Sequence, residues 1–189
     1  MSKNKEETLW ALFLEGDISS FSSLYKYYYP LLHSYGLKIN SNKQATEDCL
    51  HTFFIYLYDK REKIGLIKSV KSYLFVSFRR ALLHYLKKER NYSDFNKSYV
   101  SNFTISPEEL AIKQEFTSAK KETVAYILNT LSSREREVIY LKYYSSLSTT
   151  DISTVMGISY QSVQNTLQKA FTKLRKKIEN SIISKVLEN

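Results

Sequence analysis

The sequence predicts an all-α protein, with two small helical domains joined by a flexible linker. Glycine and proline are scarce, at four and two in 189 residues, which argues against a fold built from strands and tight turns. Apolar residues recur at helical spacing through most of the chain, and a hydrophobic content of 43% is enough for cores. The segment 93–106 lacks this spacing and is rich in serine and asparagine, so we predict the linker there.

The first domain, residues 1–92, is expected to contain four helices. Gly16 ends the first helix, and Asp17 can cap the second. Pro30 lies within the second helix and should kink or split it, because proline lacks the N–H that a helix needs. The apolar spacing places the helices at about 7–14, 17–37, 44–58 and 69–90.

The third of these helices has an unusual solvent face. Its other side is a wide apolar stripe that should be buried, so the opposite side must face outward. An exposed isoleucine beside carboxylates favours a surface that binds a protein partner. A slightly apolar surface helix without a partner is the alternative. The candidate contact residues are Glu47, Asp48, His51, Thr52 and Ile55.

The fourth helix combines basic and aromatic side chains. Basic groups can hold a nucleic-acid backbone while aromatic rings stack on unpaired bases, which suits a strand that is being opened. The alternative is an amphipathic helix whose aromatic residues, Phe75 and Phe78 among them, simply form a core. The candidate contact residues are Lys71, Tyr73, Phe75, Arg79, Arg80, His84, Lys87 and Lys88.

The second domain, residues 107–182, ends in a helix-turn-helix pattern, and residues 183–189 form a short tail. Ser106-Pro107 should start a helix that runs to about Asn129. Ser132 with Glu135 forms a capping box, and Ser148 with Asp151 repeats that pattern. Ser159 follows the turn residue Gly157 and starts the longer helix, which in such motifs enters the major groove.

The solvent face of this last helix is rich in amides. Asparagine and glutamine can make paired hydrogen bonds with an adenine edge, and lysines suit phosphates. The alternative is the solvated face of an ordinary bundle helix. The candidate DNA contacts are Tyr160, Gln161, Ser162, Gln164, Asn165, Gln168, Lys169 and Lys173.

Composition excludes several other classes of protein. The net charge of +9 favours polyanionic partners. One cysteine, Cys49, and three scattered histidines provide neither an internal disulfide nor a set of metal ligands, and we expect no cofactor. The acids form no facing pair, and no nucleophile stands beside a base, so an enzyme is not expected. No apolar run approaches 18 residues, and the polar start has no signal-peptide core, so we expect a cytoplasmic protein without membrane insertion.

The second domain resembles the promoter-recognition domain of bacterial sigma factors in the extracytoplasmic-function (ECF) group. The residues that carry this resemblance are Asp151-Ile152-Ser153, Met156-Gly157-Ile158-Ser159, Val163, Leu167, Ala170 and Leu174-Arg175. In the first domain, Thr46-Glu47-Asp48 and Phe54 resemble the family's polymerase-binding helix. Three departures are Ser153 for an alanine, His51 for a glutamine, and Asn165-Thr166 where a basic residue is common.

The resemblance implies a division of labour along the chain. Residues 44–58 would bind RNA polymerase core, residues 59–90 would melt the −10 promoter element, and residues 159–173 would read the −35 element of promoter DNA. Family members hold a flipped base where the connector 59–68 stands, and an anti-sigma factor is their usual partner. The alternative is a helix-turn-helix regulator whose N-terminal domain senses a ligand or dimerises.

Overall fold

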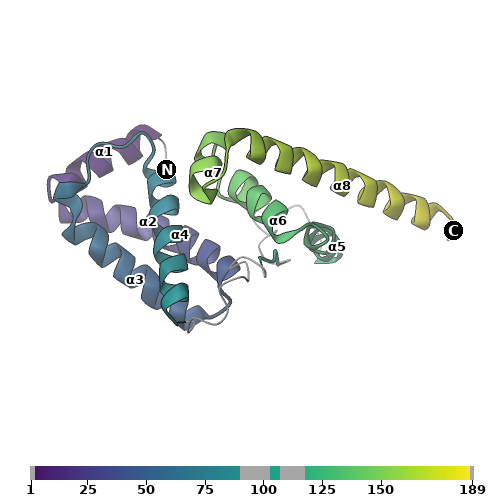
Figure 1. Ribbon diagram of the computed structural model, residues 1–189, viewed down its shortest axis with the longest axis horizontal. Helices are drawn as coiled ribbons and strands as arrows, with labels where there is room; N and C mark the ends of the chain where they lie inside the picture. The colour runs from purple at the N-terminus through teal and green to yellow at the C-terminus, as the bar shows by residue number, and fades with distance from the viewer. Residues whose placement is uncertain (1–2, 90–102, 107–117, 188–189) are drawn as a thin grey trace. The chain divides into compact units, whose positions relative to one another are not determined.

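A computed structural model describes residues 3–89, 103–106 and 118–187, and these ranges contain helices and no strands. The chain forms two compact units (Figure 1). The all-α expectation is therefore confirmed for the described residues. The predicted start of a helix at Pro107 lies outside them.

The described residues of unit 1 form four α-helices and one short 3-10 turn. Helices α2 and α3 pack on each other, and α1 and α4 both contact this pair. Trp10, Phe13, Tyr28, Leu50 and Phe78 are at most 2% exposed and form the centre of the core. The elements are α1 (Lys3–Leu14), α2 (Ile18–Ile39), α3 (Lys43–Asp59), η1 (Arg61–Lys63) and α4 (Val70–Glu89).

Side-chain caps fix where α2 and α3 begin. The Asp17 carboxylate accepts a hydrogen bond from the Ser20 backbone N–H at 2.8 Å, and Asn42 Oδ1 accepts one from the Ala45 N–H at 3.1 Å. Pro30 does not split α2, which is one helix from Ile18 to Ile39. Pro30 is exposed, and the helix buries Tyr28 and Leu32 on either side of it, so packing outweighs the missing hydrogen bond.

A glycine sets how closely α2 approaches α3. A Cβ atom added at Gly36 would lie 2.6 Å from Thr46 Cγ2 and 3.0 Å from the Phe78 ring. Thr46 is fully buried and donates a hydrogen bond to the Asn42 carbonyl at 2.9 Å. Gly36 therefore permits the contact that holds the N-terminal half of α3 against α2.

Unit 2 contains the predicted helix-turn-helix. Gly157 has a positive φ of 65° and forms the turn between its two helices. Helix α6 continues directly into a π-helical segment, η4, and α8 extends through most of the predicted tail. The elements are α5 (Ser118–Asn129), α6 (Ser133–Ile139), η4 (Tyr140–Tyr144), α7 (Thr149–Met156) and α8 (Tyr160–Leu187).

The end of the predicted linker belongs to the core of unit 2. Phe103 and Ile105 are 0% and 1% exposed, and Ile105 packs with Leu128, Ile139 and other buried residues. The Asn129 side chain accepts a hydrogen bond from the Ile105 N–H at 3.1 Å and donates one to the Ile105 carbonyl at 2.8 Å. The linker prediction was therefore wrong at this end, because residues 103–106 are anchored; residues 93–102 lie outside the described ranges.

Candidate functional site

The exposed face of α3 carries the predicted partner-binding residues. Asp48, His51 and Thr52 are exposed, and the Ile55 side chain is 64% exposed. Glu47 is half-buried, and its carboxylate lies 3.3 Å from His33 Nε2. Cys49, Phe53 and other apolar residues on the opposite side of the helix are buried, so core packing directs this face outward.

Helix α4 presents a basic face, but one predicted contact residue is buried. Phe75 is 0% exposed and packs against the Tyr35 ring at 5.3 Å between centroids, so Phe75 cannot reach a base and belongs to the core. Tyr73 is half-buried. Arg80, His84, Lys87 and Lys88 are exposed, whereas Lys71 and Arg79 are half-buried.

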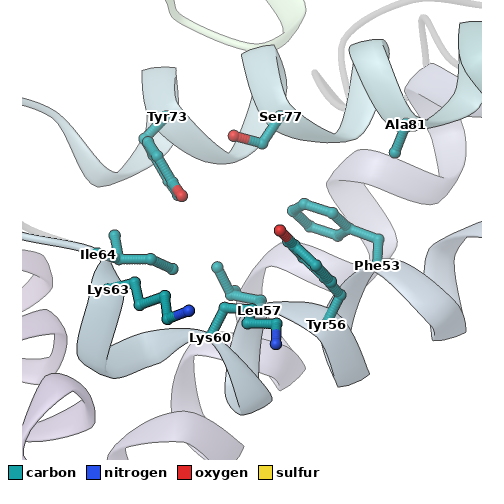
Figure 2. A pocket seen from close by; sticks show the side chains of 9 residues that line it. All are labelled: Phe53, Tyr56, Leu57, Lys60, Lys63, Ile64, Tyr73, Ser77 and Ala81. Atoms are coloured by element: carbon teal, nitrogen blue, oxygen red, sulfur yellow. The ribbon is translucent and has the colours of Figure 1, made fainter.

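A pocket of about 350 Å³ lies between the C-terminal half of α3, the connector after it and α4 (Figure 2). Figure 2 shows Tyr73, Ser77 and Ala81 on the α4 side of the pocket. Lys60 and Lys63 come from the connector, and the Tyr56 ring, which is 61% exposed, stands at the α3 side. Aromatic rings, a hydroxyl and two ammonium groups around one hollow suit an unpaired nucleotide.

Three residues of this pocket were missed as candidates in the sequence. Tyr56 lies four residues after Thr52 on the exposed side of the helix, so its spacing could have identified it. Lys60 and Lys63 stand in a short connector without helical period, so spacing alone does not identify them. Only the folded arrangement brings these three residues together with Tyr73.

Helix α8 presents the predicted amide-rich face to solvent. Gln161, Gln164, Asn165, Gln168 and Lys169 are exposed, while Val163 and Ala170 are fully buried on the other side. Gln161 Nε2 donates a hydrogen bond to Asn165 Oδ1 at 3.0 Å, and Gln164 Nε2 donates one to the Tyr160 hydroxyl at 3.0 Å. These hydrogen bonds fix the orientation of the exposed amide side chains before a ligand binds. Tyr160 is 48% exposed, and Ser162 is half-buried.

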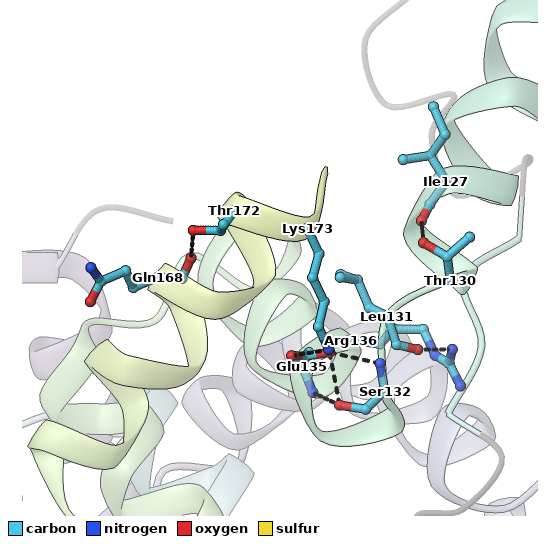
Figure 3. Close-up of polar contacts among 9 residues, drawn as sticks. All are labelled: Ile127, Thr130, Leu131, Ser132, Glu135, Arg136, Gln168, Thr172 and Lys173. Atoms are coloured by element: carbon cyan, nitrogen blue, oxygen red, sulfur yellow. Dashed lines mark hydrogen bonds and ion pairs between the residues drawn. The ribbon is translucent and has the colours of Figure 1, made fainter. Parts of the chain in front are cut away.

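Lys173 has a structural partner within the protein (Figure 3). Its ammonium group donates to both carboxylate oxygens of Glu135, at 2.8 and 3.0 Å. The same carboxylate accepts the Ser132 N–H at 2.8 Å and completes the capping box at the start of α6. Lys173 therefore ties α8 to α6, and we do not assign it to phosphate.

Arg136 joins three further parts of the same unit. Its guanidinium donates to the Phe103 and Leu131 carbonyls and, at 2.7 Å, to the Asn129 carbonyl. The last carbonyls of a helix lack partners within the helix, so Arg136 satisfies the end of α5 while holding the anchored segment. Arg136 therefore links α6 to the end of α5 and to the anchored segment 103–106.

The Glu135–Lys173 pair predicts a pH-dependent stability of unit 2. Burial alone would raise the pKa of Glu135, but the Lys173 and Ser132 hydrogen bonds outweigh it and lower the pKa below the ordinary 4.5. A lowered pKa means that the charged carboxylate stabilises the fold above about pH 4.5, and that this contribution is lost as the pH falls below that value. Glu135→Gln should cost about 1–3 kcal/mol at pH 7 and much less at pH 3.

Urea unfolding of the full chain at both pH values measures this change. Glu122 is exposed on α5, so Glu122→Gln is the matched control and should change stability little at either pH. An equal loss for Glu135→Gln at pH 3 and pH 7 would contradict the role of the charge.

The described residues offer little for catalysis. Cys49 is buried, and burial raises the pKa of its thiol to about 11, so it is not a nucleophile at neutral pH. Within the described ranges, no group of three or more His, Cys, Asp or Glu side chains could hold a metal ion. Among the same residues, no helix is both long and apolar enough to cross a membrane.

Comparisons with known proteins match both units. Residues 24–92 match the family described as Sigma-70 region 2, and residues 121–174 match the family described as Sigma-70, region 4. The two matches occur in the order predicted from the sequence, and together they cover well over half of the chain. The region 2 match favours a sigma factor over a regulator with an N-terminal sensing or dimerisation domain.

The chain is also similar to whole proteins. RNA polymerase sigma factor YlaC of Bacillus subtilis (strain 168) is 20% identical over 162 residues, which cover 86% of this chain and 94% of that protein. CnrH in complex with the cytosolic domain of CnrY is 17% identical, with a TM-score of 0.59 over 93% of this chain and 98% of that one. RpoE from Bartonella quintana, in complex with the anti-sigma factor NepR, is 16% identical, with a TM-score of 0.55 over 86% and 98%.

These structural likenesses support the fold, and the two family matches establish the lineage. The chain belongs to the sigma-70 family of RNA polymerase sigma factors, in the ECF group, whose members direct transcription initiation and are not enzymes.

Proposed function

We propose that this sigma factor binds RNA polymerase core through the exposed face of α3, opens the −10 element along α4 and its pocket, and reads the −35 element with α8. The observation that carries the proposal is that each of these helices buries an apolar stripe and presents a chemically distinct face. Carboxylates beside an exposed isoleucine suit a protein, aromatic and basic groups suit a single strand, and amides suit base edges.

The polymerase contact is proposed for the exposed face of α3. Asp48, His51, Thr52 and Ile55 share one side of α3 and are all exposed. Asp48 accepts a hydrogen bond from Gln44 Nε2 at 2.9 Å, which fixes the position of its charge. A fixed carboxylate next to an apolar side chain gives a small surface that combines orientation with apolar burial.

Asp48→Lys together with Ile55→Glu should abolish binding to core polymerase. The double variant reverses one charge and places another in the apolar contact, and both positions are exposed, so folding should be unaffected. Co-purification with core polymerase and circular dichroism are the two measurements. Glu15→Lys together with Ile18→Glu makes the same charge changes at exposed positions in the turn after α1 and at the start of α2, and it should bind like wild type. Undiminished binding by the first variant would refute the assignment.

The −10 contact is proposed for the pocket between α3 and α4. Lys60 and Lys63 provide positive charge near Tyr73, while Arg80, His84 and Lys88 continue the exposed side of α4. An unpaired base could stack in the pocket while the flanking phosphates meet these basic groups. This position agrees with the resemblance of the connector to the site where family members hold a flipped base.

Lys60→Ala with Lys63→Ala should weaken single-strand binding in a salt-dependent way. Each lost phosphate contact should reduce the slope of log affinity against log salt by about 0.7. Tyr73→Ala should instead weaken binding about equally at every salt concentration, because it removes stacking. Fluorescence anisotropy of the complex with core polymerase on mixed-sequence single strands measures both effects. Lys26→Ala, on the exposed side of α2, is the control, and an unchanged slope for the Lys60 and Lys63 variant would contradict the pocket assignment.

The −35 contact is proposed for the amide-rich face of α8. Asn165, Gln168 and Lys169 line a shallow hollow of about 420 Å³ on this face, together with Thr172 and Lys173. Amides favour adenine edges, so adenine-containing steps should be preferred over guanine runs. Lys169 is the phosphate contact of choice, since Lys173 is already paired with Glu135.

Asn165→Ala should relax the preference at one base position and cost about 1–3 kcal/mol on the best site only. Lys169→Ala should weaken all duplexes about equally, because phosphates carry no sequence. Selection of binding sites from a random duplex library, with wild type and both variants, measures these effects. If Asn165→Ala selected the same sequence as wild type, Asn165 would face solvent and would not contact a base.

The same proposal extends to a regulator and a compartment. CnrH was solved with the cytosolic domain of CnrY, and RpoE with the anti-sigma factor NepR. We infer that an anti-sigma factor also holds this chain inactive, and that both act in the cytoplasm, where the polymerase works. Co-purification of the tagged chain from its own cells, followed by identification of bound proteins, tests for that partner.

A further inference from the structure

An aromatic hollow lies between α2 and α3, beside the face of α3 that carries Ile55. Its volume is about 220 Å³. Its wall is built from half-buried or buried rings: Phe21 and Tyr25 from α2, and Phe54 and Tyr58 from α3. The Phe21 and Tyr58 centroids are 5.0 Å apart, and those of Tyr25 and Phe54 are 4.8 Å apart.

The rim of this hollow carries an acid. Asp59 and His51 line it together with Ile55, and all three side chains are exposed. Within the described residues, no hydrogen bond or ion pair is found for the Asp59 carboxylate. A carboxylate at the edge of an aromatic cup is complementary to a cation, which can face the rings and pair with the acid at once.

The chain itself shows that one of these rings accepts a guanidinium. The Arg61 guanidinium carbon lies 4.6 Å from the centroid of the Tyr58 ring, while its Nη1 donates to the Tyr58 carbonyl at 3.0 Å. Arg61 does not line the hollow, so the space between Phe21, Tyr25 and Asp59 is left to another group.

We propose that this hollow receives an arginine side chain of the protein that docks on α3, with the guanidinium stacked on Tyr25 and paired with Asp59. The inference rests on the proposed function, in which that protein is RNA polymerase core. Arginine fits better than lysine because its planar group stacks on rings and offers paired donors to a carboxylate. The hollow adjoins His51 and Ile55 of the proposed contact surface, so one partner can reach both.

Two substitutions separate a bound arginine from a bound apolar side chain. Asp59→Asn removes the charge but keeps the shape, and it should weaken core binding about tenfold, since a hydrogen bond to a charged group is lost. Tyr25→Leu keeps an apolar wall but removes the ring, and it should weaken binding roughly three- to tenfold; Tyr25→Phe should restore most of it. Titration of labelled full chain with purified core polymerase gives the affinities. Glu62→Gln is the matched control, because Glu62 is 82% exposed and does not line the hollow.

Each outcome decides something. Weaker core binding by Asp59→Asn and Tyr25→Leu, but not by Tyr25→Phe or Glu62→Gln, supports an arginine in the hollow. Normal binding by Asp59→Asn contradicts the proposal that an arginine occupies the hollow. If Tyr25→Leu also binds normally, no side chain of the polymerase enters the hollow. If only Tyr25→Leu binds more weakly, the occupant is an aromatic or apolar side chain. If the double variant Asp48→Lys with Ile55→Glu abolishes core binding in the same assay, the polymerase surface stands even when the arginine fails. If the double variant binds normally, the surface and the arginine fail together.

Discussion

Burial of one apolar stripe on each of α3, α4 and α8 is the constraint on which the rest of this protein depends. A helix has 3.6 residues per turn, so fixing which residues enter the core also fixes which residues face a partner. Leu50, Phe54 and Leu57 turn Asp48 and Ile55 outward on α3. Val163 and Ala170 do the same for Asn165 and Gln168 on α8. The chemistry of the three faces differs, but their orientation has a single cause.

Burial of an apolar stripe does not by itself fix the exact position of a helix against its neighbours. Specific contacts in each unit fix that position. In unit 1, Gly36 lets α2 approach Thr46, so α3 is held at close range. In unit 2, Glu135 caps α6 and pairs with Lys173 of α8, which joins the helix-turn-helix to the helix before it. Recognition of bases requires side chains held to within a fraction of an ångström, so a capped and paired scaffold suits that task.

The parts of the structure that follow from local spacing could be predicted from the sequence, and those that depend on distant partners could not. The outward faces of α3 and α8 were predictable because residues three or four apart share one side of a helix. The capping box at Ser132 was predictable because Glu135 lies only three residues away. Phe75 was misplaced because α4 buries a wide stripe that includes Leu74, Phe75 and Phe78, and periodicity alone does not show where a wide stripe ends.

Three further features needed the fold. The partner of Lys173 is 38 residues away, and the residues that anchor Ile105 and Phe103 are 24 and 33 residues away, so no window of sequence contains either contact. Likewise, the pocket near Tyr73 joins α4 to Lys60 and Lys63 of an irregular connector. The resemblance to sigma factors predicted the two family regions and their order, which the family matches confirm, but the side chains of these contacts came from the folded chain.

The central claim is that one chain joins polymerase binding to the reading of two promoter elements. Transcription from fragmented genomic DNA of the source organism, with core polymerase alone and with core plus the protein, tests this claim most directly when the RNA 5′ ends are sequenced. The account predicts a discrete set of new start sites that share one motif near −10 and another near −35. A protein that selects duplex sites but adds no start sites to those of core alone would contradict it, and would instead be a helix-turn-helix regulator.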